Sequence, residues 1–170
     1  MTERTGVVTF AGNPMTLLGD EVKVGDKAKD FSALKPDMSE FKLSDTLGKV
    51  VVLTAFPSVD TGVCALQTKR FNQEAGSLGD NVAIVTISAD LPFALGRFCA
   101  AEGIDKVESL SDFRGSFGED YGVTLTDGPL KGLLSRAVIV ADENNKVLYT
   151  EQVPEIVQEP NYESALDALK

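Results

Sequence analysis

Three apolar runs divide the chain and predict buried β-strands. The runs are Val50–Phe56, Val82–Ile87 and Arg136–Val140, the last of which begins with an arginine. Continuous runs of this length that are rich in β-branched residues are typical of strands buried on both faces. Between the first two runs, residues 62–78 have the pattern of a helix, which we expect to end at Gly79.

A second helix is predicted directly after the second run. We expect Asp90 to be its N-cap, Pro92 to lie in its first turn and Gly103 to end it. Shorter segments complete the pattern toward the two ends of the chain. They are a hairpin of Val7–Phe10 and Met15–Leu18 around a Gly-Asn-Pro turn, a strand near Phe31, a short helix at Ser116–Tyr121, a hairpin arm at Lys146–Tyr149 and a closing helix at Tyr162–Leu169.

The order of these elements predicts the fold class. Strands that alternate with helices indicate an α/β protein with a parallel core, and the late hairpin adds an antiparallel edge. This is the order of a thioredoxin-like fold, with a central mixed sheet flanked by helices and an added N-terminal hairpin within residues 1–20. The chain has 170 residues and no repeat, low-complexity segment or long linker, so we expect a single domain over residues 1–170.

The charge of the chain narrows the possible partners. Lys and Arg total 16 and Asp and Glu total 26, which gives a formal net charge of −10. A surface this acidic repels phosphate groups, so neither nucleic acid nor an anionic membrane is expected as a partner. No apolar segment of signal-peptide length follows residues 1–6, and Val50–Phe56 is too short to span a membrane, so we expect a cytoplasmic protein.

The chain contains no histidine. This absence excludes Ser-His-Asp and Cys-His catalysis and every zinc site with a histidine ligand. Two cysteines are also too few for a zinc site made of four thiolates. A nucleophile in this protein therefore has to be activated by its position, by a helix end, by arginine or by hydrogen bonds.

Cys64 is the candidate nucleophile because it lies in the first turn of a predicted helix. Unpaired backbone N–H groups and the helix dipole stabilise an anion there, and a thiolate is a strong nucleophile. At about 100° per residue, Phe71, Ala75 and Leu78 fall within roughly 40° of Cys64, so its side chain is expected to face inward. The same position also suits an inert cysteine on the buried face of a helix.

Two neighbours of Cys64 favour the reactive interpretation. Thr61 lies three residues earlier, so its hydroxyl can lie beside the sulfur, where it could accept a hydrogen bond from a peroxide and donate one to the thiolate. Pro57 begins the loop after the strand and can shield a thiolate from bulk water. The pattern Pro-x-x-x-Thr-x-x-Cys, with a strand before it and a helix after it, predicts a reactive thiol.

The segment Pro57–Cys64 resembles the peroxidatic cysteine motif of the peroxiredoxins. In the form Ser-Val-Asp-Thr-Gly-Val-Cys it is similar to the motif of the bacterial thiol peroxidase subfamily. Further segments resemble that subfamily's resolving-cysteine helix, its arginine strand and the entry to its C-terminal helix. They are Ser88–Ala94 with Arg97–Cys99, Gly128–Leu130 with Leu133–Ala137, and Glu159–Tyr162.

The resemblance implies a peroxidase that reduces hydrogen peroxide and organic hydroperoxides. Cys64 takes the position of the peroxidatic cysteine, Cys99 that of the resolving cysteine and Arg136 that of the active-site arginine. The two cysteines would form an intramolecular disulfide. Because a disulfide needs Cα atoms within about 7 Å of each other, our hypothesis is that the first turn around Cys64 and part of the Cys99 helix unwind locally to make the bond. The resemblance further implies reduction by thioredoxin and a homodimer built through the face near the Cys64 loop, with no metal or organic cofactor.

Alternatives remain open from the residues alone. Arg136 could instead be a charged residue that only marks the end of a strand, with the aliphatic part of its side chain covering apolar surface. Cys99 could be a half-buried core thiol without a role in the chemistry. Asp60 would oppose ionisation of Cys64 if it pointed inward, so we expect it to face solvent or the helix N-terminus. A thiol–disulfide exchanger or redox sensor, and a structural or ligand-binding α/β domain with inert cysteines, are the two other functions compatible with the pattern.

Overall fold

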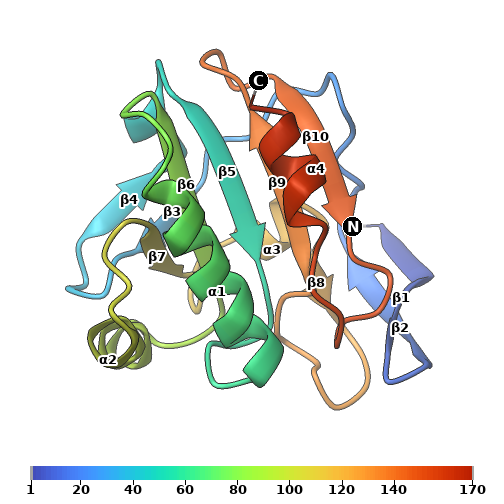
Figure 1. The fold of residues 1–170 in the computed structure, drawn as a ribbon. Helices are drawn as coiled ribbons and strands as arrows, with labels where there is room; N and C mark the ends of the chain where they lie inside the picture. The colour runs from blue at the N-terminus through green and yellow to red at the C-terminus, as the bar shows by residue number, and fades with distance from the viewer. Residues whose placement is uncertain (1, 170) are drawn as a thin grey trace.

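A seven-stranded mixed sheet forms the centre of the computed structural model, which describes residues 2–169 (Figure 1). Its strand order is β10-β9-β5-β6-β7-β3-β4, and β5, β6 and β7 are parallel to one another. The remaining neighbours are antiparallel. The strands are β3 (Ser32–Leu34), β4 (Glu40–Lys42), β5 (Val50–Ala55), β6 (Val82–Ser88), β7 (Glu108–Ser111), β9 (Ala137–Ala141) and β10 (Val147–Gln152).

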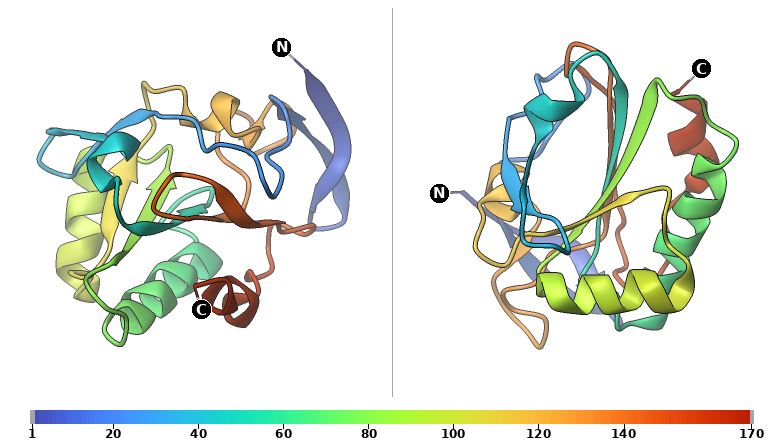
Figure 2. Two further views of the ribbon diagram at one scale, coloured as in Figure 1. Left: turned by 90° about the horizontal axis from the view of Figure 1, so that it is seen from above. Right: turned by 90° about the vertical axis from the view of Figure 1, so that its left-hand side faces the viewer.

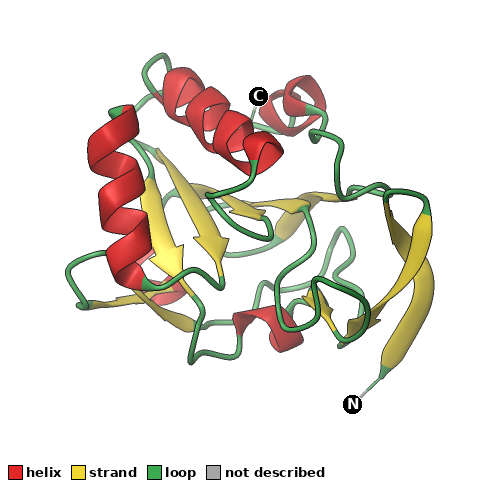
Figure 3. Cartoon of the chain, turned by 90° about the horizontal axis from the view of Figure 1, so that it is seen from below, coloured by secondary structure: helices red, strands yellow, loops and turns green. Residues whose placement is uncertain are grey.

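Helices cover both faces of this sheet. Figure 2 shows α1 and α4 on one face, while α2 runs across the end of the molecule where β5 and β6 finish. The short helix α3 lies on the opposite face (Figure 3). The helical segments are η1 (Leu43–Thr46), α1 (Gly62–Ala75), α2 (Pro92–Glu102), α3 (Phe117–Asp120) and α4 (Tyr162–Asp167). None of the helices in residues 2–169 is long and apolar enough to cross a membrane.

The N-terminal hairpin belongs to a second, smaller sheet of order β1-β2-β8. Its strands are β1 (Glu3–Phe10), β2 (Asn13–Leu18) and β8 (Thr124–Leu125). The predicted hairpin is confirmed, but its turn consists of Ala11 and Gly12, which have φ angles of 50° and 84°. Asn13 and Pro14 belong to the second strand rather than to the turn.

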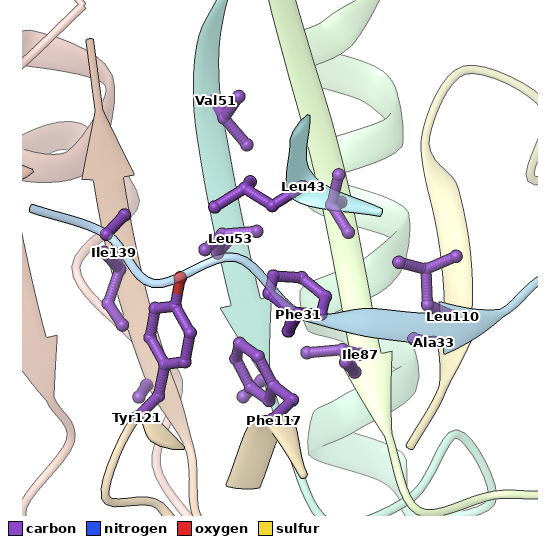
Figure 4. Packing of buried hydrophobic residues seen from close by; sticks show 14 of the residues in the cluster. Phe31, Ala33, Leu43, Val51, Leu53, Ile87, Leu110, Phe117, Tyr121 and Ile139 are labelled. Carbon is purple, nitrogen blue, oxygen red and sulfur yellow. The ribbon is translucent and has the colours of Figure 1, made fainter. Parts of the chain in front are cut away.

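The buried strands divide their side chains between two apolar layers. Val51, Leu53 and Ala55 of β5 pack into the cluster that includes Phe31 and Phe117 (Figure 4). The alternate residues of the same strand, Val50 and Val52, pack on the other face together with Phe71 of α1 and Tyr162 of α4. All six residues of β5 are buried, as a continuous apolar run predicts. The mixed sheet with flanking helices confirms the predicted α/β architecture.

Several predicted boundaries differ from the structure. Helix α1 ends at Ala75, before the predicted end at Gly79. The N–H of Gly76, which follows Ala75, donates to the carbonyl oxygens of Gln73 and Glu74 and so closes the last turn. The N-cap of α2 is Leu91 rather than Asp90, and no side chain caps this helix. Strands β4, β7 and β8 were not predicted, since each has four residues or fewer and no continuous apolar run.

Candidate active site

Cys64 lies at the point where the central strand β5 leads into helix α1. The strand ends at Ala55, the loop of residues 56–61 follows, and Cys64 is the third residue of the helix. Its side chain is fully buried, with 0% of its surface exposed, so the predicted inward orientation is confirmed. Pro57, at the start of the loop, is buried as well. The sulfur therefore lies beneath the first turn of α1 and not on the surface.

Thr61 is the N-cap of α1. Its Oγ1 accepts a hydrogen bond from the backbone N–H of Cys64 at 3.4 Å and donates one to the carbonyl oxygen of Ser58 at 3.1 Å. The hydroxyl thus lies next to Cys64 but bonds to backbone groups, whereas the sequence predicted a bond to the sulfur. In this position Thr61 fixes where the helix begins, and through that the position of Cys64.

Arg136, the residue before β9, contacts the Cys64 sulfur. Its Nη2 donates to Cys64 Sγ at 3.4 Å, its Nη1 donates to Oε1 of Gln67 at 2.7 Å, and its Nε donates to the carbonyl oxygen of Ile156 at 2.8 Å. Only 2% of the Arg136 surface is exposed. Among residues 2–169, no carboxylate lies within 4.0 Å of its guanidinium group.

A buried cation without a carboxylate partner is costly unless another anion lies close by. Of the three groups that accept hydrogen bonds from Arg136, the backbone carbonyl and the Gln67 amide are neutral. The third is the Cys64 sulfur, which becomes an anion on losing its proton. The site therefore places a buried and fixed cation directly against the sulfur of the candidate nucleophile.

Gln67 and Thr54 also belong to the site, although neither was predicted. Gln67 lies one turn after Cys64 on the same buried face of α1, and its amide nitrogen donates to the hydroxyl of Thr54 on β5. Gln67 thereby connects Arg136 to the central strand. The one hint in the sequence is a polar glutamine three residues after Cys64, on the helix face that was predicted to point inward, because a buried amide needs hydrogen-bond partners; the pattern does not show which partners these are.

Asp90 connects the Cys64 loop to the start of α2. Its carboxylate accepts hydrogen bonds from Ser58 Oγ at 2.6 Å, from the backbone N–H of Val59 at 2.9 Å and from Ser88 Oγ at 2.7 Å. This is the physical reason why Asp90 does not cap α2, as the sequence had predicted: its side chain is turned back toward the loop.

Asp60 and Arg97 form a second connection between the loop and α2. Their side chains are exposed and lie 3.2 Å apart. Asp60 thus faces solvent, as expected, and does not point toward Cys64. Arg97 is likewise a surface residue.

Cys99 lies on α2 and is partly buried. Both cysteines are free, and the Cys99 sulfur lies 3.3 Å from the hydroxyl of Ser109 on β7. The two cysteines adjoin one apolar cluster, whose buried members besides Cys64 are Phe56, Val59, Leu95, Phe98 and Ile104. Cys64 is a buried member of this cluster, and Cys99 packs against it from α2.

This arrangement can perform thiol chemistry on a small electrophile. The candidate nucleophile is a buried thiol beside a fixed cation, and it lies in the first turn of α1, where a helix leaves backbone N–H groups without intrahelical partners. Once oxidised to a sulfenic acid, such a thiol condenses readily with a second thiol nearby. Residues 2–169 contain no group of three or more side chains placed to hold a metal ion.

Known proteins resemble the chain over almost its whole length. The family model described as Redoxin matches residues 23–166. The thiol peroxidase of Bacillus subtilis (strain 168) is 54% identical over 164 residues, which are 96% of this chain and 96% of that protein.

Solved structures resemble the fold equally well. The crystal structure of a peroxiredoxin-like protein from Aquifex aeolicus has a TM-score of 0.91 and 42% identity, covering 96% of this chain and 94% of the other. A thiol peroxidase from Chromobacterium violaceum has a TM-score of 0.86 at 24% identity, covering 95% of this chain and 94% of the other, a likeness of fold alone.

Proposed function

The chain belongs to the Redoxin family and is a peroxiredoxin of the thiol peroxidase type, and on this premise we propose that Cys64 and Cys99 carry the reaction. Members of this type are peroxidases that reduce peroxides at the expense of a thiol reductant. The proposed substrates are hydrogen peroxide and organic hydroperoxides. The observation that carries the proposal is the contact of 3.4 Å between the Arg136 guanidinium group and the buried Cys64 sulfur, with no carboxylate competing for that cation among residues 2–169.

The first step oxidises Cys64. Its thiolate attacks one peroxide oxygen, the O–O bond breaks, and the other oxygen leaves with the bonding electrons and takes up a proton to become water or an alcohol. Arg136 and the backbone N–H groups of the first turn of α1 stabilise the charge that develops on the leaving oxygen. Thr61 holds that turn in place, and Pro57 shields the thiolate from water. The oxygen that is transferred keeps its hydrogen, so Cys64 becomes a sulfenic acid.

The second step forms the disulfide. The Cys99 sulfur attacks the Cys64 sulfur, the S–O bond breaks, and the oxygen leaves as water. A disulfide requires Cα atoms within about 7 Å of each other, yet Cys64 is buried under the first turn of α1 and Cys99 lies on a different helix. We therefore propose that the first turn of α1 and part of α2 unwind to form the bond.

Amide hydrogen exchange tests the unwinding directly. In the disulfide form, amides in the first turn of α1 and around Cys99 should exchange faster than in the reduced form, while those of β5 stay protected. Equal protection at both cysteines in the two forms would contradict the proposed unwinding, although it would leave the chemistry of the first step untouched.

Thioredoxin is the proposed reductant of the disulfide, by analogy with the family. We also propose a homodimer formed through the face near the Cys64 loop, which the exposed side chains of Leu91 and Phe93 beside Asp90 support. The two free cysteines are compatible with a reducing compartment, which supports a cytoplasmic location. Residues 1–170 are proposed to form one domain.

A thiol count before and after one equivalent of hydrogen peroxide tests the proposed function. The wild-type protein should rapidly lose both free thiols. The Cys99→Ser variant should accumulate a sulfenic acid that a specific reagent traps, and the Cys64→Ser variant should not react. Slow or unselective thiol loss would overturn the proposal, and reaction with small disulfides but not with peroxide would identify a thiol–disulfide exchanger instead.

A further inference from the structure

The carboxylate of Glu155 holds the turn of the N-terminal hairpin. One oxygen accepts hydrogen bonds from Thr9 Oγ1 at 2.9 Å and from the backbone N–H of Gly12 at 2.8 Å. The other accepts from the backbone N–H groups of Ala11 and Val157, each at 3.1 Å. Both oxygens are thus engaged, and the donors come from the hairpin and from the loop of Glu155 itself.

Glu155 is ionised over the whole physiological pH range. The backbone N–H groups of Val157 and Gly12 contribute most to this, Thr9 and Ala11 add to it, and together they outweigh the effect of burial and lower the pKa of Glu155 to about 2. Because this pKa is depressed, the contribution of Glu155 to stability is present above its ordinary value of 4.5 and is lost as the pH falls toward 2. The hairpin turn therefore always meets a full negative charge.

The next residue, Ile156, connects the same loop to the active site. Its N–H donates to the carbonyl oxygen of Thr9 at 2.8 Å, and the N–H of Thr9 donates to the carbonyl oxygen of Pro154 at 2.7 Å. Its carbonyl oxygen accepts the hydrogen bond from Nε of Arg136. The Ile156 side chain is buried against the hairpin and β8, in a cluster with Val8, Met15, Leu17 and Leu125.

The direction of the Ile156 carbonyl determines where the Arg136 guanidinium group points. This group is planar and rigid, so a contact that fixes Nε also fixes the direction of Nη2, which faces the Cys64 sulfur. Gln67 holds Nη1 from the other side. A displacement of the loop would leave Gln67 in place but rotate the guanidinium group away from the sulfur.

We propose that Glu155 is a positioning residue for the peroxidatic site, since it fixes to the hairpin the loop whose Ile156 carbonyl orients Arg136. The inference rests on the proposed function and assigns to the N-terminal hairpin a role in catalysis. Glu155 touches neither substrate nor the reacting atoms and acts through Arg136 alone. A purely structural role would change the stability of the protein but not the reactivity of Cys64.

The variant Glu155→Gln tests this role with almost no change in side-chain size. It removes the charge and replaces one acceptor oxygen with an NH₂ group that faces N–H or O–H donors. The rate constant for reaction of the reduced enzyme with hydrogen peroxide should fall about ten-fold, which is less than the roughly 10²-fold that a misplacement of about 1 Å can cause. Reduction of the oxidised form should proceed at the wild-type rate. Glu143→Gln, at an exposed position of the turn of residues 142–145, is the matched control and should react like the wild type.

A double-mutant cycle with Arg136→Lys separates positioning from stability. Lysine lacks the Nε contact with Ile156, so adding Glu155→Gln to this variant should cause no further loss of the peroxide rate. Full additivity of the two losses would overturn the proposal. So would a Glu155→Gln variant with a lower melting temperature and an unchanged peroxide rate.

A measurement that needs no peroxide distinguishes failure of this inference from failure of the proposed function. By NMR, the Nε–H proton of Arg136 should exchange slowly with solvent in the wild type and faster in Glu155→Gln. If the wild type does not react with peroxide, the proposed function fails, and this exchange rate still tests the positioning. Equal Nε–H exchange rates in the two proteins would refute the role of Glu155.

Discussion

Arg136 and Cys64 depend on each other. A guanidinium group buried without a carboxylate carries a desolvation penalty, and of its three hydrogen-bond acceptors among residues 2–169 only the Cys64 sulfur, at 3.4 Å, can become an anion. Conversely, a chain without histidine has no neutral base to accept the thiol proton at this site. In the proposed mechanism, activation of Cys64 therefore falls to the fixed cation and to the N-terminal end of α1.

Substitution of Arg136 should therefore act on the chemical step. Arg136→Lys keeps the charge but loses the forked hydrogen bonds to Gln67 and to the Ile156 carbonyl, and the rate constant for peroxide reduction should fall about 10²-fold, as when one donor of an oxyanion site is removed. Stopped-flow mixing of the reduced enzyme with peroxide measures it. Arg70→Lys, on the partly exposed side of α1, is the control, and equal rates for the two variants would contradict the role of Arg136.

The local sequence was enough to identify some of the site residues but not others. Cys64, Thr61 and Pro57 belong to one continuous motif, so their proximity follows from the chain itself. Gln67 was missed because nothing in the local pattern shows that a distant arginine meets it. The sequence likewise could not show that the Thr61 hydroxyl forms hydrogen bonds with backbone groups and not with the sulfur, since both lie within its reach.

The loop before α1 and the start of α2 are held together by Asp90. Three hydrogen bonds to its carboxylate join Ser58 and Val59 of the loop to Ser88 at the end of β6. This junction lies between the two helices that carry the cysteines. In the proposed mechanism these helices rearrange to form the disulfide, so Asp90 is expected to stabilise the reduced arrangement relative to the rearranged one.

Asp90→Asn should accelerate disulfide formation after peroxide oxidation. The amide keeps the shape of the carboxylate but replaces two charge-assisted acceptors with one neutral acceptor, so the loop separates from α2 more readily. Rapid quenching with a thiol-alkylating reagent after a pulse of peroxide gives the rate at which the free thiol of Cys99 disappears. Asp80→Asn, an exposed residue before β6, is the control. An unchanged or slower loss of Cys99 would show that Asp90 does not limit the rearrangement.

Asp90 also shows why some elements were predicted incorrectly. An aspartate shortly before Pro92 has the pattern of an N-cap, and only the folded loop 31 residues upstream provides the donors that draw it away. Strands β5 and β6 were predicted because their apolar runs are continuous. Short strands such as β4 depend on pairing with neighbours and have no such local signal.

The sheet topology brings the parts of the site together. Ala55 at the end of β5 pairs with Ala137 at the start of β9, so the Cys64 loop and Arg136 emerge at the same end of the sheet. Strand β6 runs parallel to β5 and ends there too, and the chain continues through Asp90 into α2. The crevice beyond the carboxyl ends of parallel strands is the usual location of sites in α/β sheets.

The parallel core and the antiparallel edge follow from the alternation of elements, but the pairing of β9 with β5 does not. From the sequence, the strand that begins at Ala137 could have joined either edge of the predicted core. Its pairing with β5 is what brings Arg136 to Cys64. The proposed positioning of Arg136 through the N-terminal hairpin depends on contacts between residues more than 140 positions apart, such as Thr9 and Glu155. Local sequence patterns do not reveal contacts of this kind.

Disulfide mapping of the whole protein after one equivalent of hydrogen peroxide tests the central claim most directly. The protein is denatured without reductant, its intact mass is measured, and its linked peptides are identified. We predict a single chain that is lighter by two hydrogen atoms and contains one link between Cys64 and Cys99. A chain with an oxidised Cys64 and a free Cys99, or a disulfide between two chains, would contradict the proposed mechanism.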